Sequence, residues 1–233
     1  IFAAGVPAMA GMVSPSGQAV PDAGGYRLKG RWQFASGIHH AEWVLAGGSV
    51  QGQELPAGIR LFVLPKSQVV VHDNWQVAGL KASGSCDYGI EDVFIPEEMT
   101  FAFLDMLLGN AVTGGAALRL GLPAIVTPFH AAVALGIARH ALDEITVQAI
   151  EKRRGSPPSP LPTHQHFQMS LGKAELELAG ARALEVEILS SLWAEASAGR
   201  TPGPARQAEA RAAATYVTEV AQRVTTVAFQ SAG

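Results

Sequence analysis

Apolar and polar positions follow two different periods along the chain, and the change falls near residue 100. In the first part, apolar residues alternate with polar ones in short segments: Tyr26 and Leu28, and residues 59–63, 69–71 and 93–95. Turn-forming residues separate these segments at positions 22–25, 47–48 and 64–66. A period of two that is interrupted by Gly and Pro is typical of short strands joined by turns. We therefore predict a β domain over residues 1–100.

The second part repeats its apolar residues at steps of three and four. One stripe consists of Phe167, Leu171, Ala174, Leu178, Ala181, Glu185, Ile188 and Leu192, in which only Glu185 is polar. A second stripe consists of Ala213, Val217, Val220, Val224 and Val227. This spacing places each stripe on one face of a long helix. Residues 123–151 form a third expected helix, in which Pro128 marks the first turn or a kink.

Short connections rich in Gly and Pro separate the expected helices at residues 155–162 and 199–204. Thr163 stands where a capping residue is expected, ahead of the stripe that starts at Phe167. Helices joined by short connections favour an antiparallel bundle. The sequence thus predicts an α+β chain whose helical domain spans residues 101–233.

Residues 120–138 contain no charged residue except Arg119 and Arg139 at their borders, and the stretch is long enough to cross a membrane. The stretch also holds Pro123, Pro128 and His130. A buried helix of a soluble bundle explains these residues better than a membrane span does. We therefore expect no membrane partner.

Composition narrows the classes of protein. Of the 233 residues, 48% are hydrophobic and 16% are charged, against about 25% charged in an ordinary domain. This balance excludes intrinsic disorder, and a net charge of −3 gives no support to nucleic-acid binding. The only cysteine, Cys86, excludes an internal disulfide and favours a reducing compartment, the cytoplasm.

Most short catalytic motifs are absent, including the phosphate loop, G-x-G-x-x-G, G-x-S-x-G and H-E-x-x-H. His39 and His40 with Glu42, or His164 with His166, offer metal ligands, but surface or capping roles explain them better. Cys86 next to Asp87 suggests a nucleophile without an identifiable base. A small buried thiol is the favoured interpretation of Cys86.

Two further strings leave alternatives open. Arg153 and Arg154 end a helical pattern, where they either offset the helix dipole or clamp a phosphate. The string G-R-W-Q-F-A-S-G at residues 30–37 sets two aromatic rings beside a hydroxyl. Its rings either pack into the β core or stack on a planar heterocycle that the hydroxyl orients.

Longer strings resemble a known family. Residues 24–45, with W-Q-F-A-S-G and H-A-E-W-V-L, are similar to the middle β domain of the acyl-CoA dehydrogenase superfamily. Residues 75–96 resemble the segment that leads out of that domain, and residues 135–143 the first long helix of its bundle. The likeness is strongest to two-component flavin-dependent monooxygenases, which hydroxylate aromatic compounds or attack sulfur heterocycles.

The resemblance implies three domains: an N-terminal helical domain, a middle β-barrel-like domain and a C-terminal antiparallel four-helix bundle, assembled as a homotetramer. By this resemblance the chain begins close to the β domain, so we expect the N-terminal domain to be missing from it. The last residues, Gln230 to Gly233, match the start of a Q-x-x-G-G cofactor turn. We therefore expect the chain to be a piece of a longer protein.

The resemblance also implies a flavin site. Trp32, Phe34 and Ala35 would contact the isoalloxazine ring, and the Ser36 hydroxyl would bond near its N5 atom. The remaining flavin contacts would come from Ser83 and Ser85, from Arg153 or Arg154 at a phosphate, and from Gln230 and Gly233 at the phosphate or adenosine end.

The implied activity is that of an oxygenase component. A separate flavin reductase would supply reduced FMN or FAD, and O₂ would convert it to a C4a-hydroperoxyflavin that hydroxylates an aromatic or heterocyclic small molecule. No catalytic acid or base and no metal ligand is assigned.

Two alternatives are an FAD-dependent acyl-CoA dehydrogenase and a flavin-free assembly protein on the same scaffold. Residues 11–21 depart from the T-E-P-x-A-G-S-D pattern of the dehydrogenases, which favours the oxygenase.

Overall fold

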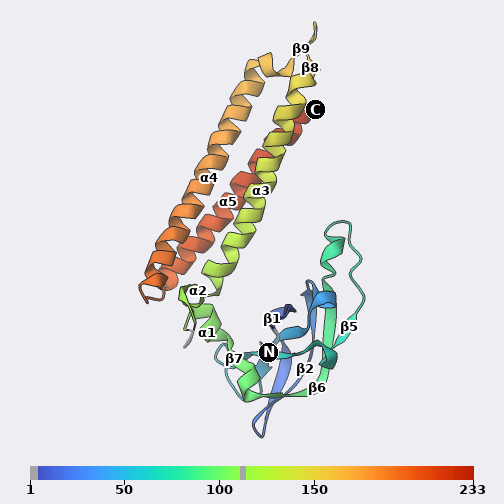
Figure 1. Ribbon diagram of the computed structural model, residues 1–233, viewed down its shortest axis with the longest axis vertical. Helices are drawn as coiled ribbons and strands as arrows, with labels where there is room; N and C mark the ends of the chain where they lie inside the picture. Colours follow the sequence, from blue (N-terminus) through green and yellow to red (C-terminus); the bar gives the residue numbers. More distant parts are fainter. Residues whose placement is uncertain (1–4, 111–113) are drawn as a thin grey trace. The chain divides into compact units, whose positions relative to one another are not determined.

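The computed structural model describes residues 5–110 and 114–233 (Figure 1). The chain divides into two compact units, residues 1–106 and residues 107–233. The first unit contains a β-sheet and the second contains long helices, so the chain is α+β. The predicted boundary at residue 100 falls before this division, because β7 (Thr100–Ala102) still pairs with β4 (Ile59–Pro65) in the sheet.

The first unit is built on a seven-stranded mixed sheet in the order β5-β6-β2-β1-β3-β4-β7. The remaining strands are β1 (Met9–Asp22), β2 (Gly25–Ala35), β3 (Trp43–Val50), β5 (Val70–His72) and β6 (Cys86–Pro96). β1 and β3 run parallel, and the other pairs are antiparallel. The strands predicted from alternation are thus confirmed. The barrel-like closure of this sheet stays a prediction.

The hairpin between β1 and β2 turns at the predicted place. Gly24 there has a φ of 78°, which an L side chain adopts only at a cost, and the Ala23 amide donates to Oδ1 of Asp22. Beneath the hairpin, Leu28, Trp32 and Tyr88 are among the largest fully buried side chains. Their burial fixes which face of β2 and β6 points into the core.

The turn predicted at residues 47–48 is wrong, because both glycines lie inside β3. A side chain at Gly47 would come within 2.3 Å of the Val13 carbonyl oxygen. Glycine is present here because the backbone of β1 approaches closely, and not because the chain reverses.

The second unit consists mainly of three long helices, α3 (Leu122–Glu151), α4 (Gln165–Ser197) and α5 (Pro204–Ala232). Two short helices precede them, α1 (Phe103–Leu108), which starts in the first unit, and α2 (Ala116–Arg119). Successive long helices run in opposite directions (Figure 1), as predicted. The fourth helix of the predicted bundle stays a prediction.

The predicted stripes face the interior of this unit. Phe167, Leu178 and Leu192 of α4 are buried, as are Val217 and Val224 of α5. The helix starts differ in one detail from the prediction: α4 begins after His164, and the Thr163 hydroxyl donates to the Pro160 carbonyl. Thr163 therefore closes the preceding turn and does not cap α4.

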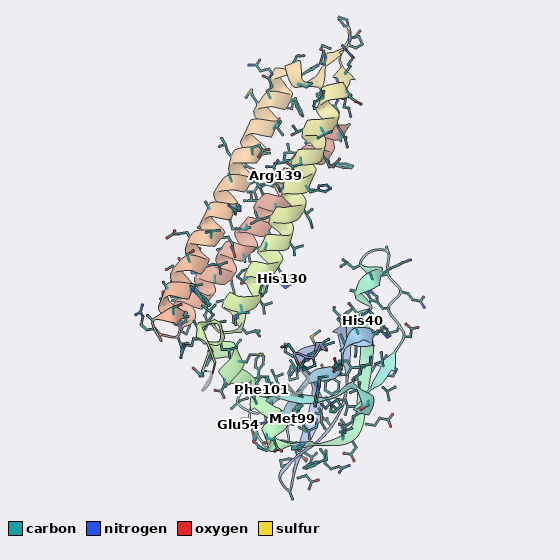
Figure 2. All side chains as sticks on the ribbon, viewed as in Figure 1. His40, Glu54, Met99, Phe101, His130 and Arg139 are labelled. Atoms are coloured by element: carbon teal, nitrogen blue, oxygen red, sulfur yellow. The ribbon has the colours of Figure 1, made fainter. Side chains whose placement is uncertain are left out.

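Polar contacts add to the packing of α3 against α4. Arg139 lies on α3 (Figure 2). Its guanidinium donates to both oxygens of Glu175 and also pairs with Asp143. Bonding to Arg139 holds the pKa of Glu175 below its ordinary value. Both side chains are about 40% exposed, so the pair contributes little to stability.

α3 is long and apolar enough to cross a membrane by length and composition. In the structure, however, Ala131, Ala138, Leu142 and Ile145 of α3 pack into the core that α3 shares with α4 and α5. One face of α3 therefore packs against α4 and α5, although less than a quarter of its most apolar window is buried.

Candidate functional site

At the end of β2, the aromatic rings of Trp32 and Phe34 lie in different surroundings. Trp32 is 1% exposed, stacks on Tyr88 with ring centroids 5.1 Å apart, and donates its indole N–H to the Gly47 carbonyl at 2.8 Å. Ala35 is fully buried. The packing interpretation therefore holds for the Trp32 ring. Contact of Trp32 and Ala35 with a flavin stays a prediction.

Phe34, in contrast, is 56% exposed. The pairing of β2 with β6 shifts register between Trp32 and Ala35, and Phe34 takes a φ of 64°, which is unusual for an aromatic residue. This irregularity turns the ring outward, where it meets the edge of Trp75 at 6.2 Å between centroids. Backbone strain of this kind concentrates at functional sites.

Trp75 is a site candidate that the sequence analysis did not single out. Its indole N–H donates to the Leu80 carbonyl at 3.1 Å, which fixes the ring beside Phe34. The signal in the sequence was a second aromatic residue at the start of the segment that also carries Ser83 and Ser85.

Three predicted hydroxyls form one hydrogen-bonded chain. Ser83 donates to the Leu80 carbonyl at 2.8 Å, and its oxygen lies 2.7 Å from that of Ser85. The Ser85 oxygen in turn lies 2.8 Å from that of Ser36. The Gly37 amide donates to the Ser83 carbonyl at 2.7 Å, which joins the end of β2 to the 3₁₀ turn Lys81–Ser83. The structure thus brings together residues 46 to 49 positions apart in the sequence.

The Leu80 carbonyl at one end of this hydrogen-bonded chain determines which serine hydroxyl donates to which. A carbonyl oxygen only accepts, so the Ser83 proton points to Leu80, and Ser85 must then donate to Ser83 and Ser36 to Ser85. The Ser36 oxygen is left with a free acceptor position. Ser85 is buried and Ser36 is exposed, so the accepting end of the chain faces outward.

Phe34 also borders a hollow of about 490 Å³ on the surface of β1 and β2. Met12, Ser14, Ser16, Arg31 and Gln33 complete its lining. Arg31 is held by Asp87, whose carboxylate lies 2.9 Å away and is nearly buried. The volume is within the range of small-molecule pockets.

The second unit brings together another group of predicted residues. Arg154 and Gln230 line one hollow of about 350 Å³. The Arg154 guanidinium donates to the Ser231 carbonyl at 3.0 Å, and a side chain at Gly233 would come within 3.2 Å of the same guanidinium. Lys152 approaches Gly233 too, and His164 and His166 line the hollow. This cluster of cationic and donor groups suits an anion such as a phosphate.

Arg153 is not part of this cluster. It is exposed, and it is absent from the lining of the hollow that holds Arg154, although the two are adjacent in the strand Arg153–Arg154. The sequence left open whether Arg153 or Arg154 binds a phosphate, and the structure favours Arg154. Side chains of consecutive strand residues point to opposite faces, which separates the two.

Comparison with known proteins shows which family and relatives the chain resembles. Residues 129–233 match the family "Acyl-CoA dehydrogenase, C-terminal domain". Indole-3-acetate monooxygenase of Pseudomonas putida is 32% identical over 190 residues, which cover 82% of this chain and 48% of that protein. A pigment production hydroxylase of a Rhodococcus species is 34% identical over 224 residues, covering 91% and 56%.

A further relative is the oxygenase component of an FADH₂-dependent resorcinol hydroxylase from a Rhizobium species, 35% identical over 107 residues, or 46% of this chain and 26% of that protein. Among solved structures, XiaF from a Streptomyces species in complex with FADH₂ and glycerol has a TM-score of 0.85 at 22% identity, covering 97% of this chain and 58% of that one. At this identity, the likeness to the XiaF structure concerns the fold alone. This chain spans about half the length of the first two relatives.

Proposed function

Because the chain belongs to the acyl-CoA dehydrogenase superfamily, with oxygenase components of flavin-dependent monooxygenases among its relatives, we propose that it is part of such a component. The protein would use reduced FMN or FAD and O₂ to hydroxylate an aromatic or heterocyclic small molecule. When bound, the flavin supplies the activation of O₂. The protein's residues bind the flavin, orient it and exclude water.

The observation that carries this proposal is the directed hydroxyl chain that ends at Ser36. Reduced flavin has a hydrogen on N5, whereas oxidised flavin does not. The free acceptor position on the Ser36 oxygen therefore matches the reduced form. Phe34 and Trp75 would offer apolar surface to the ring beside that hydroxyl.

The test compares Ser36→Ala with the parent protein in titrations of reduced and oxidised flavin under anaerobic conditions. Loss of one hydrogen bond should weaken binding of reduced flavin about fivefold to tenfold, and binding of oxidised flavin less. Ser67→Ala removes an exposed hydroxyl from the first unit and should change neither affinity. Equal loss for both redox forms would contradict the role of Ser36.

Arg154, Gln230 and Gly233 are proposed to hold the phosphate or adenosine end of a flavin. Arg154→Gln should weaken flavin binding about tenfold, as expected for loss of a charged hydrogen bond, and more strongly at low than at high salt. The adjacent Arg153→Gln removes the same charge outside the hollow and serves as the matched control. A larger effect from Arg153→Gln would contradict the assignment. Measuring FMN and FAD in parallel decides between the two cofactors.

The remaining parts of the proposal concern the whole protein. We propose a separate flavin reductase as partner, a cytoplasmic location, a barrel-like sheet and a four-helix bundle in a homotetramer. Oxygen consumption with a flavin reductase, NADH and candidate phenols or indoles tests the activity. Bleaching of bound FAD by an acyl-CoA would instead indicate a dehydrogenase.

A further inference from the structure

Three potential metal ligands converge beside the serine chain. His39 lies in the 3₁₀ turn Ile38–His40, next to the residue labelled His40 in Figure 2. Asp73 directly follows β5, and Cys86 begins β6. Their donor atoms, one each of nitrogen, oxygen and sulfur, lie within 4.8 Å of one another. The sequence grouped His39 with His40 and Glu42, but the structure brings it to Asp73 and Cys86.

The geometry of the cluster differs from that of a nucleophile with its base. In a catalytic triad, the carboxylate bonds to the imidazole nitrogen that faces away from the nucleophile. Here Nε2 of His39 lies 3.3 Å from the Cys86 sulfur, and Oδ1 of Asp73 lies 3.9 Å from the same sulfur. The imidazole and the carboxylate therefore both face the thiol, as ligands around a common centre do.

The spacing also suits a tetrahedral ion. With usual zinc bond lengths, a sulfur ligand and a nitrogen or oxygen ligand stand about 3.6 Å apart. The observed separations of 3.3 and 3.9 Å lie on either side of that value. Small side-chain adjustments would bring all three donors to bonding distance of one ion.

Neighbouring contacts hold the segments that carry these ligands. The Lys66 ammonium donates to the His39 carbonyl at 2.8 Å. The Asp87 amide donates to the Asn74 side chain at 3.0 Å, which ties the residue after Asp73 to the residue after Cys86. All three ligands line a hollow of about 290 Å³, which leaves room for a fourth ligand such as water.

We propose that His39, Asp73 and Cys86 bind one divalent transition-metal ion, with Zn²⁺ favoured by the mixed nitrogen, oxygen and sulfur donors. Cysteine thiolate and aspartate together would balance the charge of the ion. Binding would release the Cys86 proton. The ion would also fasten the segment that carries Ser83 and Ser85 to the turn that follows Ser36.

Co²⁺ is the most informative probe, because a cobalt–thiolate bond absorbs in the near ultraviolet. The purified protein, freed of metal with a chelator and kept reduced, should bind one Co²⁺ with such a band, and one Zn²⁺ should displace it. Cys86→Ser should abolish the band. His39→Gln and Asp73→Asn should each weaken Zn²⁺ binding by about tenfold or more, by analogy with disturbed metal sites.

Two kinds of control make the result decisive. Glu42→Gln alters another ligand suggested by the sequence, lies outside the lining of this hollow and should leave the affinity unchanged. His39 and Asp73 are exposed, so their variants are expected to fold even if Cys86→Ser does not, and circular dichroism checks this. The proposal is overturned if no Co²⁺ band forms, or if folded His39→Gln and Asp73→Asn bind Zn²⁺ as tightly as the parent.

Discussion

Trp32 and Phe34 stand two positions apart on β2, where strict alternation would place both on one face. The register shift before Ala35 instead leaves Trp32 in the core and Phe34 outside. The two residues should therefore respond to truncation in different ways.

We predict that Trp32→Ala lowers the free energy of unfolding by about 3–5 kcal/mol, because it opens a cavity beside Tyr88 and removes the indole hydrogen bond. Phe34→Ala should change the stability by less than about 1 kcal/mol and should weaken flavin binding. Urea denaturation and flavin titration of both variants provide the measurements. A severe loss of stability in Phe34→Ala would show that the exposed ring supports the fold.

Glu185 is the polar member of the apolar stripe on α4. It is 6% exposed, and its Oε2 has no hydrogen-bond partner within the described ranges of the chain. Burial raises the pKa of Glu185 above its ordinary value. When the pH is below the pKa that Glu185 has in the unfolded chain, its carboxyl is neutral in both the folded and the unfolded state. Burial of Glu185 then costs least. As the pH rises toward the folded pKa, the unfolded chain releases its proton first, so stability falls.

Glu185→Gln should therefore gain stability relative to the parent as the pH rises above about 4, the ordinary pKa of a glutamate carboxyl. Glu187→Gln changes an exposed carboxylate on the same helix and serves as control. Urea denaturation at several pH values measures both. The titration of Glu185 would be contradicted if the free energies of unfolding of Glu185→Gln and the parent differed by the same amount at every pH.

At the scale of elements, glycines in β3 and α3 have opposite surroundings. A side chain at Gly47 would collide with the β1 backbone, whereas one at Gly136 would meet no atom within 4 Å. Gly47→Ala should therefore destabilise the sheet by about 1–3 kcal/mol. Gly136→Ala should stabilise α3 by up to about 1 kcal/mol through higher helix propensity. Thermal unfolding of both variants tests the pair, and a Gly47→Ala protein as stable as the parent would refute the close approach of β1.

The elements also show which parts of the fold could be predicted from sequence. The helix stripes were predictable because burial repeats with the helical period, as in Val217 and Val224. Thr163 was misassigned because its hydroxyl bonds back to Pro160 and α4 starts two residues later. Gly47 was misassigned because the close approach of β1 depends on residues distant in the sequence. The same reason hid the link of Ser36 to Ser83 and Ser85, the role of Trp75 and the outward turn of Phe34. Family resemblance, and not periodicity, supplied the flavin itself.

At the scale of the whole molecule, α3 carries large apolar side chains on its outer face. Phe129, Val133 and Ile137 recur every four residues and are 67%, 64% and 58% exposed. Such a stripe is characteristic of a surface that associates with another protein surface. It supports the proposal that the protein assembles from several copies.

Sedimentation equilibrium should therefore give a mass above that of one chain, and Val133→Glu should shift it downward by placing a charge in the contact. Gln148→Glu adds the same charge at an exposed polar position of α3 and should leave the mass unchanged. A parent protein that sediments as a single chain would contradict assembly through this face.

The irregular end of β2 has a consequence for how this protein can change. The strand β2 contributes both to folding and to contact with a ligand. Because of the register shift, Trp32 serves folding and Phe34 serves contact with a ligand. Selection can then replace the outer ring without weakening the core beneath it. A library randomised at position 34 should yield many folded proteins with altered ligand preference, whereas one randomised at position 32 should yield few that fold.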